Sequence, residues 1–442
     1  MMEILRARDK IERKVRAIHF LITKKILYAN HMNLSMDTWR KVLPITAILL
    51  VYITLFALLY DSEPNVTSFS NATFVKSLSW GTYRYDVRHQ GLAPPDSTVD
   101  AGLALEWRTN RLNVKEYTAS KSSPAVDGEK LYIGLDTGEL VAVNRYTGLV
   151  EWRFKTRFSR NGIHGSPTVD ADRGYVYIGA YDGRLYAVDS ETGKRVWGTG
   201  LGDYIGSSPT LYNGTVYIGV EMRAPDGYLV GVDAETGKEV FRSDKLGNHP
   251  HSTPTIDPES GCILIGENDG YFHCYWLDNQ TERWRFKTGA AIKSTPSVMD
   301  GMVYITSWDE SFYAINITTG ISKWTFGTES SSMSSPTVDP ETGVIFFGDD
   351  AGYIYAINSS NRDEVWKYRT GDKIMSSPTL VMSTGTILVG SNDGNVYLLN
   401  AQTGDLKQKI PLISGLTGVP VAVGDHMYVF DHLGYLYSFK TS

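Results

Sequence analysis

Short apolar runs separated by polar turn residues recur from about residue 100 to the C-terminus. The segment from Ser334 to Trp366 shows the pattern most completely, and a proline precedes each recurrence. These prolines are 40 to 45 residues apart: Pro124, Pro167, Pro209, Pro254, Pro296, Pro336, Pro378 and Pro420. A fixed period of this length indicates a propeller or a solenoid.

Each repeat contains four apolar runs, which predicts four strands. The runs are too short for helices, are rich in Val, Ile and Tyr, and end at turn residues. Asp182-Gly183, Asp269-Gly270 and Asp393-Gly394 fit tight hairpin turns, because glycine accepts a positive φ. Four antiparallel strands per period are typical of a propeller blade. The sequence therefore predicts an all-β, eight-bladed β-propeller over residues 103–442.

The eighth repeat reaches Ser442 after only three runs. The segment LALEWRT, Leu103 to Thr109, has the pattern of the fourth run of the other repeats, and Trp107 precedes Trp152 by one period. We expect this N-terminal strand to complete the last blade and close the ring, because closure leaves no open sheet edge.

Residues Val42 to Tyr60 form a run without charged residues. At about 1.5 Å per residue, a helix of this length crosses a hydrocarbon core of about 30 Å. The basic flank before it predicts that the N-terminus faces the cytoplasm. The predicted domains are a basic cytoplasmic tail (1–41), a transmembrane signal anchor (42–60), an extracytoplasmic tether (61–102) and the propeller. A cleaved signal peptide is the alternative, but FALLYDSEP offers no small-residue cleavage site.

The charge is divided unevenly along the chain. The tail carries +6, from ten basic and four acidic residues, and the rest carries −12, from 33 basic and 45 acidic residues. An acidic ectodomain argues against nucleic acid as a partner. Two cysteines are too few for a disulfide-built fold. Cys274 stands where other repeats carry alanine, so free buried thiols at Cys262 and Cys274 are expected, with a disulfide as the alternative.

The segment SWGTYRYDVRHQGLAPP and the repeated motif A-x-D-x-x-TG-x-x-x-W resemble the pyrroloquinoline-quinone-like repeat proteins, which are eight-bladed propellers. The motif is seen in Ala187, Asp189, Thr192, Gly193 and Trp197. The resemblance implies that its tryptophan docks each blade onto the next. That position is held by Trp107, Trp152, Trp197, Trp284, Trp324 and Trp366, whereas Phe241 and Lys407 replace it and predict looser joints.

This family contains quinone-dependent dehydrogenases and propellers without catalytic activity. The dehydrogenases are marked by a vicinal cysteine pair, a calcium ion and an aspartate base, and Cys262 and Cys274 are not vicinal. The recurring aspartates are expected to be turn residues rather than catalytic groups: Asp182, Asp189, Asp233, Asp269 and Asp393. The sequence therefore favours the non-enzymatic branch, with no catalytic residues and no cofactor.

His249 and His251, in NHPHSTP, are the nearest approach to a metal site. Two histidines with one residue between them and no paired ligands elsewhere are weak evidence for a metal. No metal is therefore predicted, and the two residues are interpreted as loop residues at a blade junction.

Six N-x-S/T sequences follow the predicted span, at Asn65, Asn71, Asn213, Asn279, Asn316 and Asn358. The last four fall in turns that we expect on one face of the propeller. Glycosylation there would shield that face and leave the opposite face for binding.

The residue three positions before each opening proline should lie at the mouth of the central channel. In order, these are Lys121, His164, Gly206, His251, Lys293, Met333, Met375 and Thr417. Half are basic or titratable, and none is acidic, so the mouth is expected to accept an anion or an acidic protein segment. Ordinary solvated rim residues are the alternative.

The function predicted from these observations is a membrane-anchored, extracytoplasmic propeller that binds or scaffolds a protein or small-molecule ligand. A quinone-dependent dehydrogenase and an ectodomain sensor are the competing hypotheses.

Overall fold

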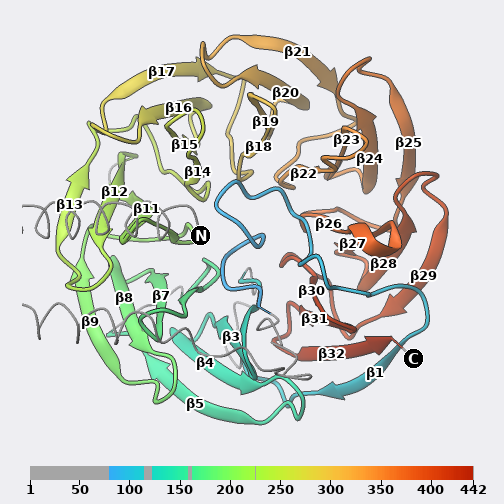
Figure 1. Cartoon of the computed structure of the whole chain (residues 1–442), viewed down its shortest axis with the longest axis horizontal. Coiled ribbons are helices and arrows are strands. Elements are labelled where there is room, and N and C mark those ends of the chain that lie inside the picture. Colours follow the sequence, from blue (N-terminus) through green and yellow to red (C-terminus); the bar gives the residue numbers. More distant parts are fainter. Residues whose placement is uncertain (1–78, 114–121, 158–161, 224, 442) are drawn as a thin grey trace, which may run out of the picture. The chain divides into compact units, whose positions relative to one another are not determined.

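The computed structural model describes residues 79–113, 122–157, 162–223 and 225–441. Within these residues, 32 strands form eight four-stranded sheets, arranged as blades around a central axis (Figure 1). The predicted all-β, eight-bladed propeller is confirmed.

Blades one to four each take four consecutive strands, numbered outward from the axis. Blade one contains β2 (Ala125–Asp127), β3 (Lys130–Gly134), β4 (Glu139–Asn144) and β5 (Val150–Lys155). Blade two contains β6 (Thr168–Asp170), β7 (Tyr175–Ala180), β8 (Arg184–Asp189) and β9 (Arg195–Gly200). Blade three contains β10 (Thr210–Tyr212), β11 (Thr215–Glu221), β12 (Gly227–Asp233) and β13 (Glu239–Arg242). Blade four contains β14 (Thr255–Asp257), β15 (Cys262–Gly266), β16 (Tyr271–Trp276) and β17 (Glu282–Lys287).

Blades five to seven follow the same order, and blade eight combines both ends of the described chain. Blade five contains β18 (Ser297–Met299), β19 (Met302–Ser307), β20 (Ser311–Asn316) and β21 (Ser322–Gly327). Blade six contains β22 (Thr337–Val338), β23 (Val344–Gly348), β24 (Tyr353–Asn358) and β25 (Glu364–Arg369). Blade seven contains β26 (Thr379–Val381), the 3-10 helix η1 (Met382–Thr384), β27 (Thr386–Ser391), β28 (Asn395–Asn400) and β29 (Leu406–Pro411). Blade eight contains β30 (Val421–Val423), β31 (His426–Phe430), β32 (Leu436–Thr441) and β1 (Leu103–Arg108).

The two middle strands of each blade are buried, because neighbouring blades cover both of their faces. In blade two, Val176 and Ile178 of β7 and Leu185 of β8 are fully buried, whereas β9 is exposed or half-buried along its length. A strand buried on both faces has a continuous apolar run rather than strict alternation. This is why the runs VYIG and LYAV lack a polar face.

The N-terminal strand closes the ring as predicted. β1 pairs with β32, with Leu103 opposite Thr441 and Trp107 opposite Ser438, so the sheet order is β1-β32-β31-β30 (Figure 1). Its register shifts between Leu105 and Trp107, and the third and fourth strands of the other seven blades show a corresponding shift. β1 therefore reproduces an outermost strand down to its β-bulge.

Residues 79–102, which the sequence assigns to the tether, cross the centre of the ring (Figure 1). This segment, which we call the channel segment, accepts backbone hydrogen bonds from the innermost strands of six blades, through the N–H groups of Val126, Val169, Ile256, Val298, Val338 and Leu380. It reaches blade three through the His89 side chain, 3.3 Å from Thr210 Oγ1, and blade eight through Ser97, which donates to Ala422 O. The inner edges of the blades are thereby paired.

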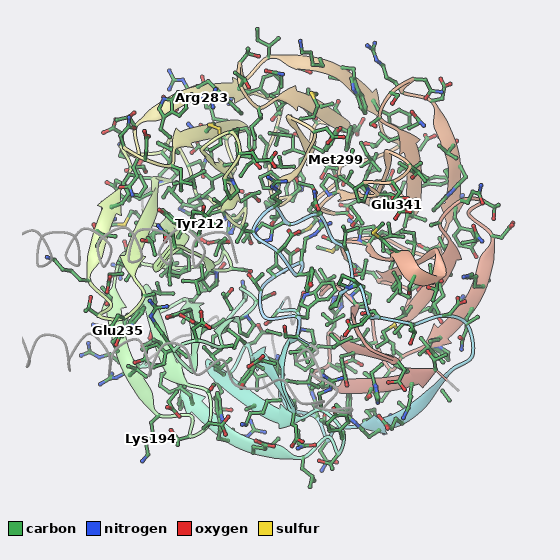
Figure 2. The ribbon with its side chains drawn as sticks, in the orientation of Figure 1. Lys194, Tyr212, Glu235, Arg283, Met299 and Glu341 are labelled. Atoms are coloured by element: carbon green, nitrogen blue, oxygen red, sulfur yellow. A yellow bond between two sulfur atoms is a disulfide. The ribbon has the colours of Figure 1, made fainter. Side chains whose placement is uncertain are left out.

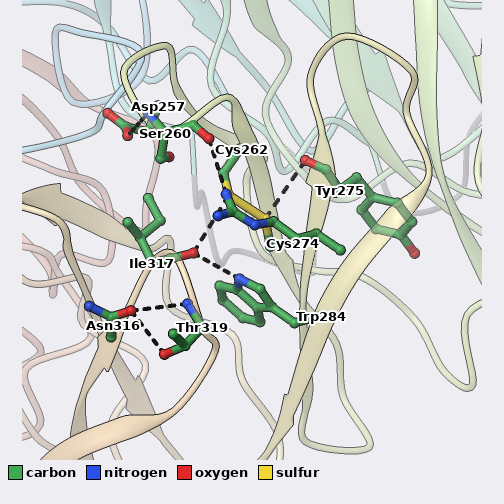
Figure 3. The surroundings of a disulfide bond; sticks show 10 residues. Asp257, Ser260, Cys262, Cys274, Tyr275, Trp284, Asn316, Ile317 and Thr319 are labelled. Carbon is green, nitrogen blue, oxygen red and sulfur yellow. Dashed lines mark hydrogen bonds between the residues drawn. A yellow bond between two sulfur atoms is a disulfide. The ribbon is translucent and has the colours of Figure 1, made fainter.

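The prediction of free thiols is wrong: Cys262 and Cys274 form a disulfide with a Cα–Cα distance of 5.7 Å (Figure 3). Cys274 of β16 pairs in register with Leu264, two residues from Cys262 on β15, so the cysteines are diagonal neighbours on one face of the blade. Their Cα separation lies within the range that a disulfide bridges. The alanines at the equivalent position of other repeats indicate only that the side chain of Cys274 is small and buried. A disulfide satisfies this condition as well as a free thiol does.

The described part of the chain contains no helix long and apolar enough to cross a membrane. The predicted signal anchor at 42–60 lies outside the described residues, as do the cytoplasmic tail and the earlier part of the tether.

Candidate functional site

Seven of the eight predicted mouth positions line one cavity of about 220 Å³ on the propeller axis. They are His164, Gly206, His251, Lys293, Met333, Met375 and Thr417. The eighth, Lys121, lies outside the described residues. The sequence thus located these positions correctly relative to one another, because each repeat places the same position at the same end of its innermost strand.

The channel segment closes the other end of this cavity. Its backbone hydrogen bonds are made to the residue two positions after the opening proline of a repeat, whereas the mouth residue lies three positions before that proline. Five residues of extended chain span about 16 Å, so the two levels lie at opposite ends of the channel. Tyr83 of the segment reaches the cavity, where its hydroxyl lies 3.5 Å from Ser377 Oγ. The mouth is therefore a blind cavity with Tyr83 at its floor.

Below the floor, the channel segment buries two basic side chains. Arg84 is fully buried and donates to Pro336 O at 2.6 Å and Thr337 Oγ1 at 2.7 Å. Burial lowers the pKa of Arg84 to about 10. His89 is also fully buried, with Nδ1 2.6 Å from Tyr83 O and Nε2 3.1 Å from Pro254 O.

A second ring of side chains surrounds the mouth residues, and it was not predicted from the sequence. It consists of the residue that follows the second strand's apolar run in each repeat: Asp136, Tyr181, Glu221, Asn268, Trp308, Asp350, Asn392 and His432. Their shared position, four residues after the tyrosine of YIG-type runs, is the signal that could have found them. The repeat alignment that gave the first ring also gives the second.

Several second-ring residues contact the mouth residues directly. His164 Nε2 lies 3.7 Å from Asp136 Oδ1, and its ring centroid is 4.3 Å from that of Tyr181. Lys293 Nζ lies 3.7 Å from the centroid of the Trp308 ring, a cation–π contact. The cavity is basic at its lining but has buried carboxylates immediately behind it.

Glu221 is the carboxylate closest to the predicted histidines. Its Oε1 lies 3.3 Å from His251 Nδ1 and its Oε2 lies 3.6 Å from His249 Nδ1. Together with Asp136, it raises the pKa of Tyr181 further than burial alone. His249 and His251 lie in the loop between blades three and four, and this loop brings them to Glu221 at the end of β11, a carboxylate that the sequence pattern did not pair with them.

Comparison with known proteins identifies the repeat. A family model described as outer membrane protein assembly factor BamB matches residues 152–257 and 225–442. The chain belongs to this family. Its curated relatives include BamB of Moranella endobia, 24% identical over 49% of this chain and 55% of the relative, and BamB of Alkalilimnicola ehrlichii, 26% identical over 44% and 51%. The matched region thus spans about half the length of these relatives.

Quinone-dependent enzymes are similar to the chain as well. The quinohemoprotein alcohol dehydrogenase of Comamonas testosteroni is 28% identical over 34% of this chain and 23% of its own length. Its crystal structure superposes with a TM-score of 0.69 at 14% identity, covering 82% of this chain and 80% of that one. BamB from Moraxella catarrhalis superposes with a TM-score of 0.61 at 19% identity, covering 76% and 99%. These structural matches show the fold, which both branches of the family share.

The tryptophans that the family resemblance singled out lie between blades. The indole N–H of Trp107, Trp152, Trp197, Trp284 and Trp366 donates to a backbone carbonyl of the next blade at 2.8 to 3.1 Å. Each of these rings lies against the glycine of the next blade's TG turn, as Trp152 lies against Gly193. Trp324 packs on Tyr304 and Phe312 of its own blade. The next turn carries Arg362 in place of glycine.

The two joints without tryptophan are built differently. Phe241 makes an edge contact with Tyr275 of blade four. Lys407 Nζ instead lies 2.6 Å from Asp100 Oδ1 and 2.7 Å from Thr386 Oγ1. Lys407 therefore ties blade seven to the chain just before β1, at the joint where the ring closes.

The recurring aspartates make turn contacts. Asp189 and Asp233 accept hydrogen bonds from the backbone and hydroxyl of the threonine three residues later. Asp269 accepts from the Tyr271 N–H, and Asp393 accepts from the Tyr397 hydroxyl at 2.6 Å. Asp182 accepts from the Arg184 N–H. Such contacts stabilise hairpins.

The sequons divide by exposure. Asn213, with a φ of 47°, and Asn279 are exposed, whereas Asn316 and Asn358 are half-buried and accept turn hydrogen bonds through Oδ1. Asn65 and Asn71 lie outside the described residues. Asn213 also lines a groove of about 600 Å³ between blades three and four, with Tyr212 and Trp276.

Proposed function

We propose that this chain is a single-pass membrane protein whose propeller lies outside the cytoplasm and acts as a non-enzymatic binding or scaffolding module. The channel mouth receives an anionic group or an acidic segment of a protein partner. The observation that carries this proposal is the convergence of His164, His251 and Lys293 on one blind cavity. Relatives that are named as outer membrane protein assembly factors support a role in protein contacts.

The first test is of binding at the mouth. The full chain in detergent is titrated with a fluorescein-labelled oligoglutamate peptide, and binding is followed by anisotropy at low salt. Changing both Lys121→Ala and Lys293→Ala removes two positive charges from predicted mouth positions and should weaken binding at least about tenfold, because a cavity focuses the field of charges at its mouth and Lys293 lines this one.

The matched control removes the same charge elsewhere. Lys194 and Lys238 are exposed in turns between third and fourth strands, and Lys194 lies at the outer rim (Figure 2). Lys194→Ala with Lys238→Ala should leave the affinity nearly unchanged. Equal affinities of the two double variants would place the anion site elsewhere.

The topology is tested separately, with the full chain in intact cells. Protease added outside should digest the propeller and leave a short N-terminal tag protected, since the basic flank directs the tail to the cytoplasm. Digestion of the tag would contradict this orientation.

A quinone-dependent dehydrogenase is the second candidate, because relatives of both kinds match the chain at comparable identity. The Cys262–Cys274 disulfide links two strands within blade four, beside Trp284, rather than adjacent residues (Figure 3). The absorbance spectrum of the purified full chain separates the two functions. A stoichiometric bound quinone would favour the enzyme.

A further inference from the structure

Glu221, His249 and His251 bring three metal-ligating atoms together beside the channel mouth. One carboxylate oxygen and one nitrogen from each imidazole all lie within 4.8 Å of one another. Glu221 is buried, and both histidines are about one-quarter exposed, so ions can enter from the cavity side.

The backbone holds these residues from two blades. Glu221 is the last residue of β11, where its N–H and C=O both pair with Tyr204. His249 and His251 flank Pro250, and the His251 N–H donates to His249 O at 3.2 Å. The Pro250 carbonyl lies against Gly219 of β11. The histidine loop is therefore seated on the strand that carries the glutamate.

The hydrogen bond of His249 orients its ring for metal binding. Its Nε2 lies 2.9 Å from Met222 O, a contact in which Nε2–H donates to the carbonyl. Donation from Nε2 leaves the Nδ1 lone pair directed at Glu221. A backbone carbonyl that accepts from the distal ring nitrogen is the usual support of a metal-bound histidine.

The distances fit zinc. With Zn–N and Zn–O bonds of about 2.0–2.1 Å, neighbouring ligand atoms of a tetrahedral site are about 3.4 Å apart. Glu221 Oε1 lies 3.3 Å from His251 Nδ1 and Glu221 Oε2 lies 3.6 Å from His249 Nδ1, close to this value, and one ligand atom from each of the three residues lies within 4.8 Å of the other two. Calcium is disfavoured, because it takes six to eight oxygen ligands. A set of two imidazoles and one carboxylate instead suits zinc with one open position.

Gly206 leaves room for the ion. A Cβ at this position would lie 2.6 Å from Glu221 Oε1, 2.9 Å from the Tyr181 hydroxyl and 3.1 Å from His251 Nδ1. Three polar atoms thus converge on the volume that one methyl group would fill. Gly206 has no positive φ, so its lack of a side chain matters for space rather than for backbone conformation.

We propose that Glu221, His249 and His251 bind one zinc ion at the channel mouth, with the fourth coordination position facing Gly206 and the cavity. Two neutral imidazoles and one carboxylate leave a net charge of +1 on the bound ion, which suits water or an anion in that position. The site stands on its own geometry and does not rest on the proposed partner binding.

The test uses the full chain without a histidine tag, stripped with a chelator and titrated with zinc chloride by calorimetry. One zinc ion should bind per chain. Cobalt in its place should give the visible absorption of tetrahedral coordination. Glu221→Gln and His251→Gln should each weaken zinc binding at least about tenfold, since each removes a ligand.

Gly206→Ala is the sharpest variant, because it keeps all three ligands and puts a methyl group beside Glu221 Oε1 and His251 Nδ1, in the space that the fourth coordination position faces. It should weaken zinc binding at least about tenfold while its zinc-free melting curve shows that the propeller is folded. His432→Gln, which changes a histidine beside Thr417 on the other side of the mouth, is the control and should bind zinc as the unmodified chain does. No zinc uptake, or equal affinity in Gly206→Ala and the unmodified chain, would overturn the proposal. Failure of the unmodified chain to bind the acidic peptide, with zinc binding intact, would count against the proposed function alone.

Discussion

At the scale of single residues, two buried histidines have pKa values shifted in opposite directions. Burial lowers the pKa of His89 to about 4, against the opposing effect of the Tyr83 and Pro254 carbonyls. Burial also disfavours the charged form of His273, but Glu267 and Glu282, each 2.6 Å from a ring nitrogen, outweigh it and raise the pKa. The two residues therefore make the free energy of unfolding depend on pH with opposite signs.

His89 should make the propeller sensitive to acid. In the unfolded state, with a histidine pKa of about 6.5, His89 becomes protonated as the pH falls below that value. In the folded state it stays neutral until the pH approaches 4. The contribution of neutral His89 to the free energy of unfolding is therefore complete above pH 6.5. It falls by about 3 kcal/mol as the pH decreases toward 4. Chemical unfolding of the full chain at a series of pH values measures this, and His89→Gln should flatten the acid side of the profile.

His273→Gln provides the comparison of opposite sign. Its raised pKa means that His273 stabilises the fold below pH 6.5 and loses this contribution as the pH rises through the folded value. The variant should keep the acid-side slope and lose stability mainly at low pH. An unchanged acid slope in His89→Gln would show that another group controls acid unfolding.

At the scale of elements, the joints between blades combine a ring, a turn and one hydrogen bond. Trp284 shows how they fit together: its indole donates to Ile317 O at 2.8 Å, its ring lies against Gly320, and the disulfide lies beside it (Figure 3). Arg283 Nη1 lies 3.4 Å from Cys262 Sγ and donates to Ser260 O. The disulfide therefore stabilises the β15–β16 hairpin at the joint between blades four and five.

The disulfide should contribute measurably to stability. The cysteines are separated by 12 residues, and a loop of this size is stabilised by roughly 3 kcal/mol when cross-linked. The double variant Cys262→Ala with Cys274→Ala should melt at a lower temperature than the oxidised chain. Reductant should lower the melting temperature of the original chain and leave that of the double variant unchanged. A linked peptide pair in non-reducing mass spectrometry confirms the bond, and its absence would contradict the structure here.

At the scale of the whole molecule, the region before the first blade pairs with the propeller in two places. The channel segment pairs with the inner edges of the blades, and β1 immediately after it pairs with the outer edge of blade eight. The ion pair between Lys407 and Asp100 lies between these two places, because it links blade seven to the turn between the channel segment and β1. The ring is thus held from its centre and from its rim by one stretch of about 30 residues.

Deleting residues 101–109 should open the ring. The deletion removes β1, unpairs β32 and removes Trp107 from its contact with the Arg145 carbonyl of blade one. Exposed strand edges favour aggregation. The full chain without these residues should aggregate or lose its single cooperative melting transition. A deletion of equal length at 62–70, in the predicted tether, should melt as the unmodified chain does, and equal behaviour of the two deletions would show that the ring closes in another way.

The repeat architecture could be predicted from the sequence alone. Strand number, blade number, the closing strand and seven cavity-lining positions follow from apolar runs, turn residues and a period of 40 to 45, which are local features repeated along the chain. Because the eight repeats fold into eight equivalent blades around one axis, the residues at a position shared by all repeats lie in a ring. This is why Trp107 and β1 could be placed without knowing any contact.

Where the repeats differ, the contacts depend on how the blades and loops meet in three dimensions. The path of residues 79–102 through the channel depends on backbone groups of seven blades and on the Thr210 hydroxyl of blade three, and no local pattern marks it. Glu221 meets His249 and His251 because blade three ends beside the loop that enters blade four, a contact between segments with unrelated patterns. The disulfide likewise depends on register, since Cys274 pairs with Leu264 and so comes within bonding distance of Cys262. Local sequence encodes the blade, whereas the closed ring determines which loops and side chains meet at its axis.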